Sequence, residues 1–322
     1  MAQPLKHDAY TVACICPTDT EMAAVEGMLD EIHPSLPSSR DTTSYSLGRI
    51  GQHSIVIGVM PEGTNPAASV ATQLLNDFPS VRFGLLVGTG GGVPSITYDI
   101  RLGDVVVSKP TDTYGGVIQY DRGKRTTGGQ FKRTGSLNKP PSVLLSAMGR
   151  LEAKNRREKS KVPIHLRDML QKWPIMKDEY VYQGADQDEL YEVGYDHSGG
   201  PTCKTCDKSR LVDRGGPRRN NEPKMFYGTI GSANVVLKDG AEREKLREAL
   251  GVLCVEMQAA SLMDGFPCLV ICCIRDYADS HENKQWQPYA AATAAAYMKE
   301  LLLIIPTTQN KKTDKAADVM GK

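Results

Sequence analysis

The sequence contains no apolar run near the roughly 20 residues that a membrane-spanning helix requires, so we expect no membrane partner. Its first ten residues, MAQPLKHDAY, lack the apolar core and the small-residue cleavage site of a secretory signal. Eight cysteines in 322 residues are too sparse for a disulfide scaffold, and five of them stand in apolar, strand-like runs: Cys14, Cys16, Cys268, Cys272 and Cys273. We therefore expect a cytoplasmic protein with reduced thiols.

The sequence also lacks an excess of charge of one sign. In all, 39 Lys and Arg residues stand against 38 Asp and Glu residues, which predicts no nucleic-acid partner. The distribution is uneven, because residues 121–160 hold 11 basic and 3 acidic residues and residues 201–224 hold 7 and 3. We interpret residues 121–224 as a basic, partly flexible insertion, or alternatively as an anion-facing surface beside a phosphorylated substrate.

No internal repeat divides the chain, and we expect a single domain over residues 8–306 with a polar tail at 307–322. Outside the basic segment, strand-like runs alternate with helical patterns. The expected strands are Thr11–Cys16, Tyr45–Ile50, Ser54–Met60, Phe83–Val87, Asp104–Ser108, Phe226–Ile230, Val252–Val255 and Cys268–Ile274. The expected helices are Glu21–Leu29, Asn65–Asn76, Ala241–Leu250, Glu256–Asp264 and Tyr289–Ile305. This alternation predicts an α/β protein whose central sheet is covered on both faces.

Four polar residues stand where an expected strand has just ended: Glu21, Thr89, Glu256 and Asp276. Taken singly, the three carboxylates have simple structural explanations, such as a helix cap or, for Asp276, an ion pair with Arg275. Taken together, the four residues predict one site, because open α/β sheets bind ligands at the carboxyl ends of their strands.

A glycine run, Gly88-Thr89-Gly90-Gly91-Gly92, follows the expected strand Phe83–Val87. It is not the fingerprint of a dinucleotide-binding dehydrogenase, because no helical pattern follows it. It also lacks the Lys-Ser or Lys-Thr of a Walker loop. Two interpretations remain: a turn without a ligand, or a loop whose backbone closely approaches one.

Five segments, in this order, resemble the nucleoside phosphorylase/nucleosidase superfamily, which includes purine nucleoside phosphorylases, uridine phosphorylases and methylthioadenosine nucleosidases. They are VACICPTDTE (12–21), VGTGGG (87–92), GSANVV (231–236), VEMQAA (255–260) and RDYAD (275–279). The resemblance is nearest to the fungal branch found in immune-receptor-like proteins. It implies a three-layer α/β/α sandwich around a mixed sheet, an enzyme acting on an N-ribosidic bond, and a homo-oligomer. We expect no cofactor.

The resemblance implies catalytic roles for Asp276 and Glu21. Asp276 matches the aspartate that holds or protonates purine N7, which requires a raised pKa, and burial at the end of an apolar strand would raise it. Glu21 matches the glutamate that activates water in hydrolytic members. The implied substrate-binding set is Thr89, Gly90 and Gly91 beside the nucleophile, Ser232, Asn234 and Val236 along the base, and Glu256, Met257 and Gln258, with Met257 against the ribose.

Hydrolysis is favoured over phosphorolysis. In the family, a phosphate site normally includes an arginine just before the glycine run, where this sequence has Leu86. A carboxylate at Glu21 suits a water nucleophile and would repel phosphate. An arginine from a neighbouring subunit or from the basic segment would reverse this expectation, so a purine nucleoside phosphorylase is the alternative.

Two departures from the family pattern favour another class, a non-catalytic nucleotide-binding or oligomerising module. Gln258 stands where a second glutamate commonly grips the ribose, and Val236 stands where an aromatic ring often stacks on the base. The expected substrate is an adenine nucleoside or 5′-nucleotide. Asp276 selects a purine, adenine follows from the resemblance alone, and the basic segment favours 5′-phosphates as in AMP or ATP.

A CxxC pair, Cys203 and Cys206, follows His197 closely. A structural zinc ion needs four ligands, and only three candidates cluster here. We therefore expect loop cysteines rather than a metal site, with zinc at these three residues as the alternative.

Overall fold

The computed structural model describes residues 5–36, 44–60, 66–128, 131–200, 202–218 and 220–320. Within these ranges, eleven strands form one mixed sheet, whose main path runs β10-β6-β13-β5-β1-β4-β3-β2. The strands of this path are β1 (Val12–Cys16), β2 (Glu31–His33), β3 (Tyr45–Ile50), β4 (His53–Val59), β5 (Phe83–Gly92), β6 (Val105–Ser108), β10 (Met225–Gly228) and β13 (Cys268–Asp276). The other members are β7 (Val117–Gln119), β11 (Ile230–Ser232) and β12 (Cys254–Glu256), while β8 (Gly123–Arg125) and β9 (Phe131–Arg133) pair separately.

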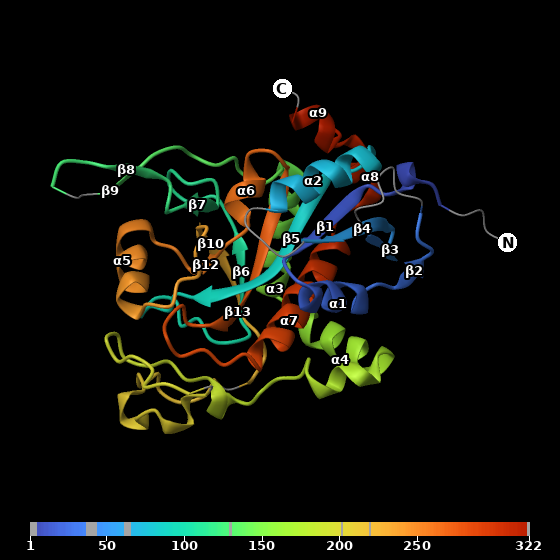
Figure 1. The fold of residues 1–322 in the computed structure, drawn as a ribbon. Helices are drawn as coiled ribbons and strands as arrows, with labels where there is room; N and C mark the ends of the chain where they lie inside the picture. The colour runs from blue at the N-terminus through green and yellow to red at the C-terminus, as the bar shows by residue number, and fades with distance from the viewer. Residues whose placement is uncertain are drawn as a thin grey trace.

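Helices cover both faces of the sheet, which confirms the three-layer α/β/α arrangement (Figure 1). One face carries α1 (Asp19–Gly27), α3 (Ser142–Asn155), α4 (Val162–Lys172) and α7 (Trp286–Leu302), and the other carries α2 (Pro66–Asp77) and α6 (Ala259–Met263). The remaining α-helices of the described ranges are α5 (Gly240–Leu250), α8 (Thr307–Lys312) and α9 (Ala316–Met320). None of the described helices is long and apolar enough to span a membrane.

The core is centred on α7, β5 and β13. Residues 290–296 of α7, with the sequence AAATAAA, are all buried, as expected for a helix that is apolar on nearly every side. Its small side chains let the helix lie close against β5 and β13. The site residues at the ends of these strands are therefore held by elements that are themselves buried in the core.

The basic segment contains two helices, α3 and α4, where the sequence analysis assigned no element. Leu144 and Leu151 of α3 and Met169 of α4 are buried in the main core. Apolar residues in α3 recur at intervals of three or four, as in an amphipathic helix. The basic side chains between them lower the mean hydropathy, which is why composition alone suggested a solvated insertion. Residues 129–130, 201 and 219 of this segment lie outside the described residues.

The tail expected from residue 307 is partly packed on the sheet. Asn310 of α8 is buried, and its Nδ2 donates to the hydroxyl of Thr11 at 2.9 Å and lies 3.3 Å from Nδ1 of His53. Ala316 is also buried. The expected helix over 65–76 is observed from Pro66, and Asn65 and the last two residues of the tail lie outside the described residues.

Strand β5 continues past Val87 to the end of the glycine run, so the expected loop at residues 88–92 is wrong. Two strands flank this extension, β13 in parallel with Asp276 beside Gly91 and β12 antiparallel with Val255 also beside Gly91. A Cβ on Gly90 would lie 2.5 Å from the carbonyl oxygen of Val255. Glycines are thus required here because neighbouring backbones approach the strand closely.

Candidate active site

One pocket brings the ends of β1, β12 and β13 together around the glycine extension of β5. Nine of the eleven predicted site residues line it: Glu21, Thr89, Gly90, Gly91, Val236, Glu256, Met257, Gln258 and Asp276. The antiparallel pairing of β12 with the extension brings Glu256 back toward Gly90. The expectation of one site built from four strand ends is consistent with this placement.

Glu21 is fixed in place by two threonine hydroxyls. Helix α1 starts at Asp19, so Glu21 lies in its first turn, and only 1% of the residue is exposed. Thr89 donates to Oε1 at 2.8 Å, and Thr18 donates to Oε2. The helix N-terminus favours a negative charge at this position. The carboxylate is therefore held in a defined orientation at the wall of the pocket.

Asp276 ends β13 after a shift in register that follows Ile274, a bulge-like irregularity that redirects a side chain. The amide of Ala278 donates to Oδ1 at 2.8 Å, and Nε of Arg275 lies 3.2 Å from Oδ2. Burial raises the pKa of Asp276 and outweighs the opposing effects of the Arg275 charge and the Ala278 amide. A carboxyl group with a raised pKa keeps its proton to higher pH, as a proton donor must.

Glu256 is buried next to Met257 and Gln258, which are predicted to bind the ribose. Its Oε2 accepts hydrogen bonds from the backbone N–H groups of Gln258 and Ala259, both at 2.9 Å. Burial raises the pKa of Glu256, although the Ser232 hydroxyl and these two amides act in the opposite direction. The carboxyl group of Glu256 therefore organises the turn that presents Met257 and Gln258 to the pocket.

Ser232 and Asn234, predicted to lie along the base, do not line the pocket. Ser232 is fully buried, and its hydroxyl accepts from the amide of Ala260 at 3.0 Å. Asn234 is exposed, and its backbone N–H donates to Oδ2 of Asp121 at 2.8 Å. Because β11 ends at Ser232 beside Glu256, the residues of this motif that line the pocket are the later ones, Val235 and Val236. The contact of Ser232 and Asn234 with a base stays a prediction.

Several pocket residues were not singled out by the sequence analysis: Pro17, Thr18, Tyr120, Val235, Leu237, Val255 and Gln287. Tyr120 matters most, because it is the one aromatic side chain among the described residues of the wall. Burial, followed by the charges of Asp121 and Glu256, raises its pKa to about 12, so the phenol is neutral. Tyr120 follows β7, a strand of three residues that no sequence periodicity reveals.

Arg275 is the only Lys or Arg among the described residues that line the pocket. Its guanidinium is already engaged, because Nε pairs with Asp276 and Nη1 donates to Gln287 at 3.3 Å. No described residue of the basic segment 121–224 reaches the pocket wall. The pocket therefore contains no unpaired cation within the described part of the chain.

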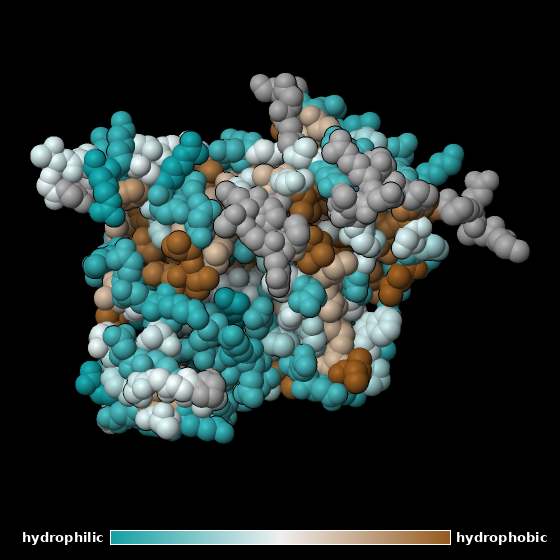
Figure 2. All heavy atoms as spheres, viewed as in Figure 1, coloured by the Kyte–Doolittle hydropathy of each residue, from teal (hydrophilic) through white to brown (hydrophobic). Residues whose placement is uncertain are grey.

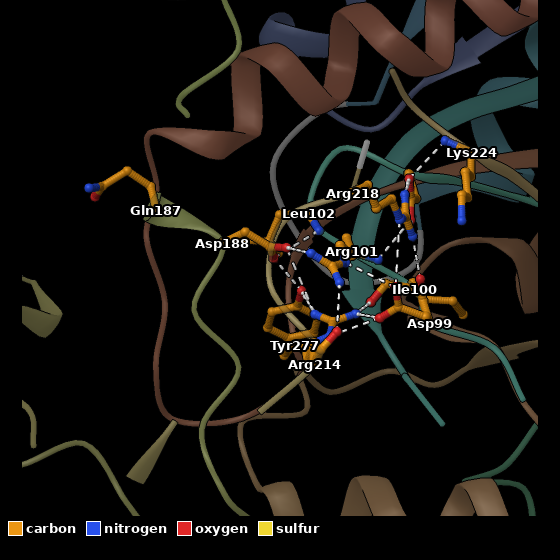
Figure 3. A network of polar contacts seen from close by, with 12 residues as sticks. Asp99, Ile100, Arg101, Leu102, Gln187, Asp188, Arg214, Arg218, Lys224 and Tyr277 are labelled. Carbon is orange, nitrogen blue, oxygen red and sulfur yellow. Dashed lines mark hydrogen bonds and ion pairs between the residues drawn. The ribbon is translucent and has the colours of Figure 1, made fainter. Parts of the chain in front are cut away.

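Two arginines of the basic segment instead form a buried network with aspartates (Figure 3). Arg218 makes two contacts of 2.7 Å with Asp104, and Arg214 pairs with Asp99 and donates to the hydroxyl of Tyr277 at 2.6 Å. Both arginine side chains are 11% exposed. The interpretation of an anion-facing surface is therefore wrong for Arg214 and Arg218. Arg214 instead holds Tyr277, the residue after Asp276, in place.

The structure also brings His197, Cys203 and Cys206 together. Nδ1 of His197 lies 3.1 Å from the sulfur of Cys206 and 3.7 Å from that of Cys203. None of the three lines the pocket.

We expect Gly91→Ala to displace the carboxyl group of Asp276 and to destabilise the protein. A Cβ at this position would lie 2.7 Å from the Cβ of Ala278 and 2.8 Å from Oδ1 of Asp276, so the carboxyl group must move. Overpacking of this kind costs about 1–3 kcal/mol of unfolding free energy. Gly149→Ala is the matched control, since nothing lies within 4 Å of its Cβ. Thermal unfolding of both variants tests this prediction, and a Gly91→Ala variant as stable as the parent would contradict it.

Comparison with known proteins shows the family. Residues 11–303 match the phosphorylase superfamily, so the chain belongs to that superfamily. A nucleotide-binding leucine-rich repeat (NLR)-like protein of Hyaloscypha variabilis (strain UAMH 11265 / GT02V1 / F) is 44% identical over 304 residues. The match covers 94% of this chain but only 30% of that protein's length.

Solved structures share the fold at low sequence identity. Futalosine hydrolase of Helicobacter pylori strain 26695 has a TM-score of 0.59 and 14% identity, over 92% of this chain and 99% of that one. The 5′-methylthioadenosine/S-adenosylhomocysteine nucleosidase of Neisseria meningitidis, in complex with methylthio-immucillin-A, has a TM-score of 0.57 and 16% identity, over 91% and 98%. This chain therefore has the nucleoside phosphorylase/nucleosidase fold.

Proposed function

We propose that the chain is a purine N-ribosyl hydrolase, which cleaves the N-glycosidic bond of an adenine nucleoside or 5′-nucleotide and releases free adenine. Three carboxyl groups line one pocket, and the environments of two of them, Glu21 and Asp276, support this proposal most strongly. Glu21 is fixed by two threonine hydroxyls, and burial raises the pKa of Asp276. The fixed orientation of Glu21 suits a general base, and the raised pKa of Asp276 suits a general acid.

In the proposed reaction, Glu21 accepts a proton from water while the water oxygen bonds to C1′ of the ribose. The bond from C1′ to N9 breaks, its electron pair goes to the purine, and Asp276 delivers a proton to N7. Met257 and Gln258 contact the ribose, and Tyr120 offers an aromatic surface to the base. Proton exchange with solvent then returns Glu21 to the carboxylate and Asp276 to the acid.

Two features of the pocket favour water over phosphate as the nucleophile. Phosphate binding normally uses cationic partners, and the single cation of the described wall, Arg275, is paired with Asp276. The carboxylate of Glu21 would in addition repel phosphate. The same lack of an unpaired cation favours a substrate with a neutral 5′ group. We therefore expect adenosine or a 5′-thioether to be cleaved faster than AMP or ATP, in contrast to the 5′-phosphates that the basic segment favoured.

A chromatographic assay of free-base release tests the proposed function. The substrates are adenosine, methylthioadenosine, AMP, ATP, inosine and guanosine, each with and without phosphate. We expect adenine release that does not depend on phosphate. Release that requires phosphate would make the protein a purine nucleoside phosphorylase and contradict the role of Glu21.

A non-catalytic nucleotide-binding or oligomerising module is the second candidate. Gln258 replaces a charged residue with a neutral one, and the 44% identical relative is an NLR-like protein more than three times as long as the matched region. In that case the protein binds purine nucleotides, as measured by calorimetry, but releases no base even at high protein concentration.

The pH dependence should report the proton on Asp276. Because its pKa is raised and the acid form is the active one, kcat/KM falls as the pH rises through that pKa. The charge of Arg275 lowers the pKa of Asp276, so Arg275→Gln should move this alkaline limb to higher pH. A pH–rate profile of the two proteins checks the sign, and a shift to lower pH would contradict it.

A further inference from the structure

We propose that His197, Cys203 and Cys206 bind a zinc ion, with His281 as the fourth ligand, in a site separate from the pocket. This revises the expectation of metal-free loop cysteines. For Zn–S bonds of about 2.3 Å and Zn–N bonds of about 2.0–2.1 Å, tetrahedral geometry places nitrogen and sulfur roughly 3.6 Å apart. The observed separations from Nδ1 of His197 are 3.1 and 3.7 Å, and all three ligand atoms lie within 4.8 Å of one another.

The second ring nitrogen of His197 is placed as in a metal-binding histidine. Its Nε2 lies 2.9 Å from the carbonyl oxygen of Gly200, which can only accept a hydrogen bond. Nε2 therefore carries the hydrogen, and Nδ1 presents its lone pair to the two sulfurs. Metal-binding histidines typically donate the other N–H to a carbonyl or carboxylate in this way.

His281 provides an independent observation at the same place. The residue is only 6% exposed, and neither of its ring nitrogens has a hydrogen-bond partner, which is costly for a buried polar group. Its ring centroid lies 5.7 Å from that of His197, while Tyr191 stacks on it at 4.0 Å. Oδ1 of Asp279 lies 3.7 Å from Nδ1 of His281, beyond hydrogen-bond distance. If the ring turns toward His197, one of its nitrogens gains a metal partner and the site has four ligands.

The surroundings suit a structural ion. The segment around the cluster has a largely hydrophilic surface (Figure 2), and Cys203 and His197 are half-buried, so an ion can reach the site. Zinc binding displaces the protons of the two thiols into solvent and leaves two thiolates. The amide of His197 already donates to the hydroxyl of Ser280 at 2.9 Å. The ion would cross-link the loop of residues 197–206 to the turn that contains His281.

Cobalt titration of the full chain tests the proposal directly. The protein is stripped of metal under reducing conditions and titrated with Co²⁺. We expect one Co²⁺ ion to bind per chain, with a thiolate-to-cobalt charge-transfer band and the visible bands of a tetrahedral site. Added Zn²⁺ should displace the cobalt and abolish these bands. Zinc should also raise the thermal midpoint. A parent protein that binds neither ion overturns the proposal, and this result needs no variant to fold.

Variants identify the ligands. Cys203→Ser, Cys206→Ser and His197→Gln should each weaken Co²⁺ binding by more than about 100-fold, and His281→Gln by about 10-fold or more. Thr205→Ser, between the two cysteines, is the matched control and should bind like the parent. Undiminished charge-transfer intensity in both cysteine variants overturns the site, and undiminished affinity in His281→Gln overturns the fourth ligand.

Discussion

Asp276→Asn is expected to lower kcat by about 10²–10⁴-fold, the range of general acid–base catalysis. The amide has the shape of the protonated acid, and its oxygen can still accept from the Ala278 amide, but it cannot deliver a proton to the base. Arg275 loses one partner and keeps its contact with Gln287. The change therefore removes the proposed proton donor while preserving the geometry of the pocket.

The stability of Asp276→Asn should not fall together with its kcat. A carboxyl group whose pKa is raised by folding contributes stability below its unfolded pKa, and that contribution is lost as the pH rises through the folded pKa. Above that folded pKa, Asp276 therefore adds nothing to the free energy of unfolding. The thermal midpoint of Asp276→Asn should equal or exceed that of the parent. Asp168→Asn is the control, since this exposed carboxylate pairs with Arg167 and does not line the pocket. A slow variant that is also strongly destabilised would contradict this account.

Glu21→Gln is expected to lower kcat by a similar factor, about 10²–10⁴-fold, because an amide cannot take a proton from water. KM should change little, since Glu21 is proposed to act on the nucleophile rather than on the purine or ribose. The side-chain oxygen of glutamine can still accept from Thr89 or Thr18. Steady-state kinetics with adenosine in phosphate-free buffer measure both constants.

Glu26→Gln provides the matched control for this change. Glu26 lies on the same helix, accepts from the hydroxyl of Ser46 and does not line the pocket. Its kcat should equal that of the parent, because Glu26 is not among the residues that line the pocket. If Glu21→Gln kept the parent kcat, another group would have to activate the water, and the division of roles between the two carboxyl groups would be wrong.

The features that sequence could predict are those fixed by local patterns. The apolar runs of β1 and β13 and the hairpin of β3 and β4 are observed close to the expected bounds. The resemblance to the superfamily is confirmed by the match over residues 11–303. Glu21 and Asp276 fall at strand ends that sequence periodicity marks clearly, and they line the same pocket.

The features that sequence missed depend on contacts between distant segments. The extension of β5 through Gly92 is stabilised by pairing with β12 and β13, which no local propensity of glycine would indicate. Tyr120 reaches the pocket because β7 pairs with β11, far along the chain. The burial of Ser232, which pairs opposite Glu256, likewise depends on a strand that comes later in the chain.

Hydrolysis in H₂¹⁸O tests the central claim most directly. The protein is incubated with adenosine in phosphate-free H₂¹⁸O, adenine is quantified by chromatography, and the ribose is analysed by mass spectrometry after a short reaction time. The proposed mechanism predicts adenine together with ribose that carries ¹⁸O at C1, and the loss of both signals in Glu21→Gln and Asp276→Asn. Adenine release only after phosphate is added, with ribose 1-phosphate as the second product, would contradict the claim.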